Sequence, residues 1–105
     1  FVARILAIDA DAKVIVLGDF NDFPWSKPVH TLAGKELENL IEHLPENERY
    51  TYLYEGNAEV LDHILVSKSL AEKADYFDIV HINAEMLPAM RLSDHDSVIA
   101  VFTFD

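Results

Sequence analysis

The pattern of apolar and polar positions at the start of the chain predicts a helix followed by a strand. Apolar residues spaced three to four apart predict a helix over residues 1–12. Residues 13–20 then contain four consecutive apolar residues, mostly β-branched, which stop at Gly18. Because such a run has no polar face, it predicts a strand that is buried on both faces.

The next stretch predicts two helices. Two prolines mark a loop over residues 21–28. Ser26 is placed to cap a short helix that stops at Gly34. A second apolar stripe with helical spacing predicts another helix over residues 37–44, which is closed by Pro45.

Strand patterns dominate the second half of the chain. Residues 50–54 and 59–67 are separated by a short turn and predict a hairpin. Two more strands are expected at residues 76–82 and 97–104, with a long loop over residues 83–96 between them. This order of elements predicts an α/β protein of the α+β kind, with a mixed sheet and helices on one face.

The composition fits one small domain with a core of its own. The chain has 105 residues, of which 50% are hydrophobic and 26% charged. The absence of cysteine excludes a disulfide scaffold and a thiolate zinc site. No apolar run approaches the roughly 20 residues that a membrane helix needs, so we expect no membrane partner.

The net charge narrows the function classes. The chain has 8 Lys and Arg against 19 Asp and Glu, which gives −11. A protein that holds a polyanion by itself is usually basic, so this balance disfavours a passive nucleic-acid binder. A metal-dependent enzyme that acts on phosphates stays open, because cations can bring the positive charge to its site.

Polar groups interrupt the predicted strands at two places. Asp19 and Asn21 lie two residues apart at the carboxyl end of the first strand, where sheets often bind ligands and where turns also favour these residues. Asp62 stands in a row of apolar residues that share one strand face. A buried carboxylate without a partner would lose its charge, so Asp62 is expected to have a cation, a histidine or backbone donors beside it.

A third polar segment, Ser93-Asp94-His95, precedes the last predicted strand. An Asp-His pair suits metal ligation and acid–base chemistry, although a polar loop that caps the sheet edge has the same composition. The other four histidines are interpreted as structural: His30, His43, His63 and His81. The alternating tyrosines of residues 50–54 fit a base-stacking platform or one face of the hairpin.

These three segments resemble the endonuclease/exonuclease/phosphatase (DNase I-like) superfamily. Gly18-Asp19-Phe20-Asn21 is similar to its GDxN motif, Leu61-Asp62-His63-Ile64 to its late-strand Asp motif, and Ser93-Asp94-His95 to its closing SDH motif. Order and approximate spacing agree from about Val14 to the end of the chain. The chain is most similar to bacterial predicted extracellular nucleases of this superfamily, which implies an extracellular or secreted parent protein.

The resemblance implies a role for each motif residue. Asp19 would orient or deprotonate the attacking water, and Asn21 would hold the scissile phosphate. His95 would contact the phosphate, and Asp62 would fix and charge His95. Asp94 would be a ligand of a divalent metal, Mg²⁺ or else Mn²⁺ or Ca²⁺.

The function implied is metal-dependent hydrolysis of a phosphodiester, of the nuclease type, with nucleic acid or another phosphodiester as substrate. Arg91 is a candidate phosphate contact because it lies close to the SDH motif. A phosphatase or a lipid phosphodiesterase of the same superfamily is the alternative. A non-catalytic assembly module is the alternative from a different class.

The resemblance also implies that part of the site is missing. The family has an early Asn, a metal-binding Glu and a central His or Tyr, and no residue here matches them. Its fold is a four-layer αββα sandwich, of which this chain could supply one sheet with its helices. We therefore expect residues 1–105 to be a single partial domain, the C-terminal half, and to be inactive alone. The N-terminal half would be its partner, or a second copy would cover the exposed sheet face.

Overall fold

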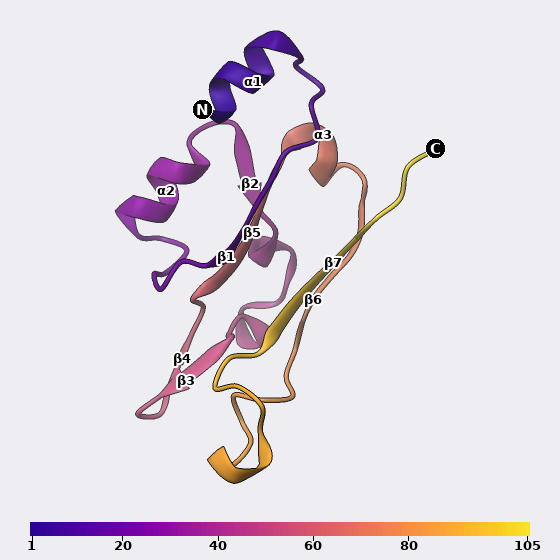
Figure 1. The fold of residues 1–105 in the computed structure, drawn as a ribbon. Helices are drawn as coiled ribbons and strands as arrows, with labels where there is room; N and C mark the ends of the chain where they lie inside the picture. The colour runs from indigo at the N-terminus through magenta and orange to yellow at the C-terminus, as the bar shows by residue number, and fades with distance from the viewer.

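The computed structural model describes all of residues 1–105, as helices and antiparallel strands (Figure 1). The α-helices are α1 (Val2–Ile8), α2 (Lys27–Ala33) and α3 (Lys68–Ala71). The strands are β1 (Ile15–Asp19), β2 (Leu37–Asn39), β3 (Tyr52–Tyr54), β4 (Asn57–Glu59), β5 (Asp62–Ser67), β6 (Ala74–Val80) and β7 (Ser97–Phe102). Three 3₁₀ helices complete the fold: η1 (Leu40–His43), η2 (Glu46–Glu48) and η3 (Pro88–Met90). None of the helices is long and apolar enough to span a membrane.

Strand β5 is the centre of the arrangement. It lies between β1 and β2 in a three-stranded sheet, while β3–β4 and β6–β7 form two separate ladders. Every pairing is antiparallel, and the α+β class expected from the sequence is confirmed. In Figure 1 the β3–β4 hairpin and the loop before β7 lie at the same lower end of the molecule.

The hydrophobic core is packed between β5, η1 and β6. Its nine buried side chains are Leu40, Ile41, Leu44, Val60, Ile64, Val66, Leu70, Phe77 and Ile79. Burial of these side chains removes most of the apolar surface of β5 from water, and this strand is therefore a rigid base for residues at its ends.

Helix α2 forms as the sequence predicts. The Ser26 hydroxyl accepts a hydrogen bond from the Val29 backbone N–H at 3.3 Å, and a proline occupies the first turn. The helix ends at Gly34, whose φ of 55° favours glycine. The hairpin is also confirmed, but it is shorter than predicted and consists of β3 and β4. The rest of its predicted second strand forms β5, which pairs with β1 and β2.

Two predicted helices are wrong in extent or type. The first covers only Val2–Ile8 of residues 1–12. Residues 37–44 form strand β2 and then η1, because Leu37 to Asn39 pair with the far half of β5. The Asn39 side chain ends this strand by accepting a hydrogen bond from Ile41 N–H at 3.2 Å. The apolar positions of the stripe are still buried, which is why their spacing resembled a helix.

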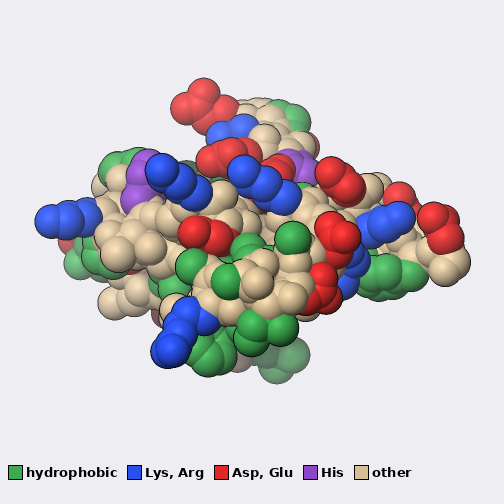
Figure 2. Space-filling view, turned by 90° about the horizontal axis from the view of Figure 1, so that it is seen from above, with side chains coloured by type: hydrophobic (Ala, Val, Ile, Leu, Met, Phe, Trp, Pro, Cys, Tyr) green, Lys and Arg blue, Asp and Glu red, His purple; other side chains and the backbone are tan.

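Strand β1 is not buried on both faces, contrary to the prediction. Ile15 is 44% exposed and Leu17 64% exposed, because β1 is an edge strand with one uncovered face. Ile99 and Val101 of β7 are exposed to a similar degree. On the face drawn in Figure 2, hydrophobic side chains reach the surface in several groups between acidic and basic ones.

Candidate active site

The three motif segments meet at one end of β5. Asp19, the last residue of β1, is the register partner of Asp62, the first residue of β5. His95 reaches the same place from the loop before β7, and its Nδ1 donates a hydrogen bond to Asp62 Oδ2 at 2.7 Å. One ligand atom from each of these three side chains lies within 4.8 Å of the other two.

His95 is the partner that the sequence predicted for the Asp62 carboxylate. The carboxylate is 19% exposed and its partner is a histidine, one of the three possibilities that the sequence left open. The two residues are 33 positions apart. Only the turn of the chain through β6 and back toward β7 brings them into contact.

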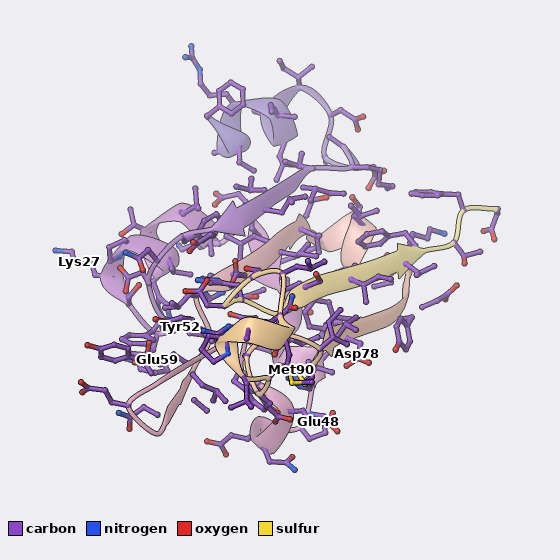
Figure 3. The ribbon with its side chains drawn as sticks, turned by 60° about the horizontal axis from the view of Figure 1, so that its bottom comes forward. Lys27, Glu48, Tyr52, Glu59, Asp78 and Met90 are labelled. Carbon is purple, nitrogen blue, oxygen red and sulfur yellow. The ribbon has the colours of Figure 1, made fainter.

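The surroundings of His95 favour its positively charged form. Burial by itself lowers the pKa of His95, but the hydrogen bond to Asp62 and the nearby negative charges outweigh it and raise that pKa. The charges come from Asp62, Asp19 and Asp94. The ring also packs against Tyr52, with ring centroids 5.0 Å apart. Figure 3 labels Tyr52, its cross-strand partner Glu59, and Met90 in the loop that leads to His95.

Asp19 and Asn21 form a tight turn and do not continue the strand. Asn21 has a φ of 50°, in the left-handed region, and its backbone N–H donates to Asp19 Oδ1 at 2.8 Å. The strand alternation that placed both side chains on one face therefore ends at Asp19. Both residues are exposed, and Asp19 belongs to the three-residue cluster.

Asp94 and Arg91 lie outside this cluster. Asp94 is exposed, and its charge acts on His95 at a distance. Arg91 is half-buried in the same loop. The loop is held near its end by the Ser93 hydroxyl, which accepts a hydrogen bond from His95 N–H at 3.0 Å. The metal-ligand role of Asp94 and the phosphate contact of Arg91 therefore stay predictions.

His63 is a structural histidine, as its place in the apolar segment suggested. It is 2% exposed. Its Nε2 donates to the Asp22 carbonyl at 2.8 Å, and its Nδ1 accepts from Asn39 Nδ2 at 3.1 Å. The ring stacks on Phe20. With both nitrogens occupied, His63 offers no atom to a ligand.

A second His-Asp pair, which the sequence analysis missed, lies directly beside the cluster. The Asp96 side chain is fully buried and accepts hydrogen bonds from His81 Nδ1 at 2.9 Å and from the backbone N–H groups of Asn83 and Ala84. Burial alone would raise the pKa of Asp96, but these hydrogen bonds lower it. An acidic residue directly before an apolar strand was the available signal.

A small cavity adjoins the cluster. It has a volume of about 270 Å³ and is lined by Asp19 and Asp62 together with Asp96 and the first residues of β7. A larger cavity of about 490 Å³ lies elsewhere and is lined by Trp25, Arg49 and Tyr50 among others. The larger cavity shares no residue with the cluster, so the chemistry of the side chains locates the candidate site better than size does.

The two carboxylates of the cluster fit a hard divalent cation, because Mg²⁺ and Mn²⁺ accept carboxylate oxygens. His95 in its charged form has no lone pair for a metal, so it faces the substrate side of such a site. The hydrogen bond between Asp62 Oδ2 and His95 Nδ1 leaves the second oxygen of Asp62, the Asp19 carboxylate and His95 Nε2 for a ligand or a substrate.

The chain belongs to the endonuclease/exonuclease/phosphatase family, whose family model matches residues 1–95. The family hydrolyses phosphodiesters or phosphate monoesters, and its members typically use divalent metals. The predicted resemblance is thus confirmed at the level of the family. No curated protein and no solved structure matches the chain.

Proposed function

We propose that this chain takes part in metal-dependent hydrolysis of a phosphodiester, of the nuclease type. The observation that carries the proposal is the meeting of three distant motif segments, with Asp19, Asp62 and His95 within 4.8 Å of one another and a 2.7 Å hydrogen bond inside the group. A structural role alone does not require two carboxylates and a histidine to gather at an accessible strand end.

Each residue has a task that its surroundings support. Asp19 is exposed and orients or deprotonates the attacking water. His95, charged and held by Asp62, donates from Nε2 to a phosphate oxygen and stabilises the negative charge of the transition state. Asn21, in the turn next to Asp19, holds the scissile phosphate through its amide.

A divalent metal would supply the positive charge that this acidic chain lacks, and it would lower the pKa of a bound water. Asp94 is the proposed protein ligand, with Mg²⁺ as the preferred ion and Mn²⁺ or Ca²⁺ as alternatives. Arg91 is the proposed additional contact for the phosphate.

We further propose that residues 1–105 supply one half of the catalytic domain and are inactive alone. Two observations support this. The Asn and Glu motifs of the first half of the family have no counterpart in the sequence. The apolar face of β1 at Ile15 and Leu17 is exposed and is therefore free for a partner to cover.

The activity is tested by incubating supercoiled plasmid with Mg²⁺ and either this chain alone or this chain joined to a first half of the family domain that carries the early Asn and Glu motifs. The joined form is called the longer protein below. We expect nicking by the longer protein only, lost with a chelator and lost in His95→Ala. Nicking by these 105 residues alone, abolished in His95→Ala, would show that they suffice. Inactivity of the longer protein on every substrate would favour the assembly module.

The substrate class is tested by comparing initial rates of the same longer protein on DNA, sphingomyelin vesicles and inositol phosphates. Nuclease chemistry predicts that DNA is cleaved fastest. A faster rate on a phosphate monoester or on the lipid would assign the chain to the phosphatase or lipid branch of its family.

The apolar face is tested by sedimentation at micromolar concentration. If a second copy covers β1 in the isolated chain, the chain sediments as a dimer and Leu17→Glu shifts it to a monomer. Leu53→Glu, which changes an exposed leucine on the hairpin, is the matched control and leaves the dimer intact. A wild-type monomer contradicts the dimer.

A further inference from the structure

Thr51 is a fully buried junction beside the cluster. Its Oγ1 accepts hydrogen bonds from the backbone N–H groups of Leu61 at 3.1 Å and Asp62 at 3.4 Å. Its carbonyl accepts the backbone N–H of Asp96 at 2.7 Å. One residue therefore holds the backbone of Asp62 and also the backbone of the residue that follows His95.

Asp96 holds the same segment from the other side. Its buried carboxylate accepts the backbone N–H groups of Asn83 and Ala84 at 2.8 and 2.9 Å, so it ties the start of the long loop to its end. The Asn83 side chain in turn donates to the His95 carbonyl at 3.0 Å. The backbone on both sides of the His95 side chain is thus fixed by hydrogen bonds, although the middle of the loop is exposed.

We propose that Thr51 and Asp96 are positioning residues that set the geometry of the His95–Asp62 pair. This inference rests on the proposed function, because it assigns them a purpose in the same site. Neither side chain belongs to the group of possible ligands. Thr51 acts on the backbone of Asp62, and Asp96 acts through Asn83, whose side chain holds the His95 carbonyl. The precision matters because a displacement of about 1 Å in a catalytic group can cost roughly 10²-fold in rate.

The competing explanation is that Thr51 merely stabilises the fold, as any buried hydroxyl does. Ser67 provides the matched control. It is also buried, it accepts from Val14 N–H at 3.1 Å and donates to the Ala12 carbonyl at 2.8 Å, and it lies at the opposite end of β5. A merely structural role predicts that Thr51→Val and Ser67→Ala have the same consequences.

The first readout is the ring nitrogen spectrum of His95 in the ¹⁵N-histidine-labelled chain, assigned with His95→Gln. It reports the hydrogen bond to Asp62 and needs no activity. We expect the signature of a hydrogen-bonded Nδ1 in the wild type, in Ser67→Ala and in Thr51→Ser, which keeps the hydroxyl. We expect this signature to be lost in Thr51→Val.

Asp96→Asn is the second variant and keeps the inference testable if Thr51→Val does not fold. Its control is Asp78→Asn on β6, because Asp78 also accepts a backbone N–H, from Ile79, and the hydroxyl of Tyr76. Figure 3 shows Asp78 well apart from Tyr52. We expect loss of the His95 signature in Asp96→Asn and its retention in Asp78→Asn.

The second readout is kinetic and uses the longer protein on DNA. Thr51→Val is expected to lower kcat roughly 10²-fold with little change in KM, and Thr51→Ser to restore it. An unchanged His95 signature in both Thr51→Val and Asp96→Asn, or its absence from the wild type, overturns the inference. If the signature changes as expected while no protein form hydrolyses a phosphodiester, positioning stands and the proposed function fails.

Discussion

The molecule contains two His-Asp pairs that differ in what surrounds them. In both pairs Nδ1 of the histidine faces a carboxylate oxygen, at 2.7 Å for His95–Asp62 and at 2.9 Å for His81–Asp96. Asp62 is partly exposed and lies beside Asp19, whereas the Asp96 side chain is fully buried and is saturated by backbone N–H groups.

The second ring nitrogen separates the pairs further. Nε2 of His81 is buried without a partner, and the ring is stacked on Tyr50 with centroids 4.0 Å apart. His95 stands next to an accessible cavity edge formed by two acids. We therefore assign the proposed reaction to His95–Asp62 and a scaffold role to His81–Asp96, because Nε2 of His81 and the Asp96 carboxylate are both buried.

The largest expected effect comes from removing Nε2 of His95. Asparagine places its amide nitrogen near the position of Nδ1 and has no counterpart of Nε2. His95→Asn is expected to lower kcat for phosphodiester cleavage by roughly 10²–10⁴-fold, the range of a lost acid–base group.

His81→Asn is expected to lower the same kcat far less, because its Nε2 is not accessible. Steady-state rates of the longer protein on DNA check both variants. Equal losses in the two variants would erase the distinction between the pairs.

The next effect concerns folding stability. Asp96→Asn places an amide N–H₂ among three buried donors and is expected to cost about 1–3 kcal/mol or more in the free energy of unfolding. Asp62→Asn is expected to cost less, because its carboxylate is partly solvated. Urea unfolding of the isolated chain measures both variants. A larger loss in Asp62→Asn would contradict the assignment of Asp96 as the scaffold acid.

The two pairs contribute to folding stability with opposite dependences on pH. The folded pKa of Asp96 is lowered, so its contribution is present above the unfolded pKa of about 3.9 and is lost as the pH falls through the folded value. The folded pKa of His95 is raised, so its contribution is complete below about 6.5 and is lost as the pH rises through the folded value.

Both contributions are measured by plotting the free energy of unfolding against pH. The loss at low pH is the acid limb of this curve, and the loss of the His95 contribution is the limb above neutrality. Asp96→Asn is expected to flatten the acid limb and His95→Asn the limb above neutrality. An acid limb that is unchanged in Asp96→Asn would show that other carboxylates set it.

The smallest expected effect concerns Tyr50, whose ring stacks on His81 of the buried pair. A hydrogen bond to Glu85, with burial and nearby acids, raises the pKa of Tyr50 to about 12. The tyrosinate absorbance of the folded chain should therefore show a step near that pH. Tyr50→Phe keeps the stack on His81, so it should remove the step and change the free energy of unfolding by about 1 kcal/mol or less. Persistence of the step in Tyr50→Phe would assign it to another tyrosine.

Local signals were enough for several elements of the fold. The Ser26 cap and Gly34 stop defined α2, because a cap depends on a few neighbouring residues. The lone carboxylate in an apolar row showed that Asp62 needs a partner. The order of the GDxN, Asp and SDH segments was sufficient to recognise the family, whose model matches the chain.

The remaining features depend on contacts between distant segments. Spacing marked the buried positions of residues 37–44, but pairing with β5 made the first three of them a strand. The exposed face of β1, the partner of Asp62 and the junction at Thr51 likewise became visible only when β5 and the loop before β7 were brought together. The sequence by itself determined the family and the groups that we propose to carry the chemistry. Only the tertiary structure decided which of them meet, because hydrophobic burial specifies that a side chain leaves water and not which neighbour it finds.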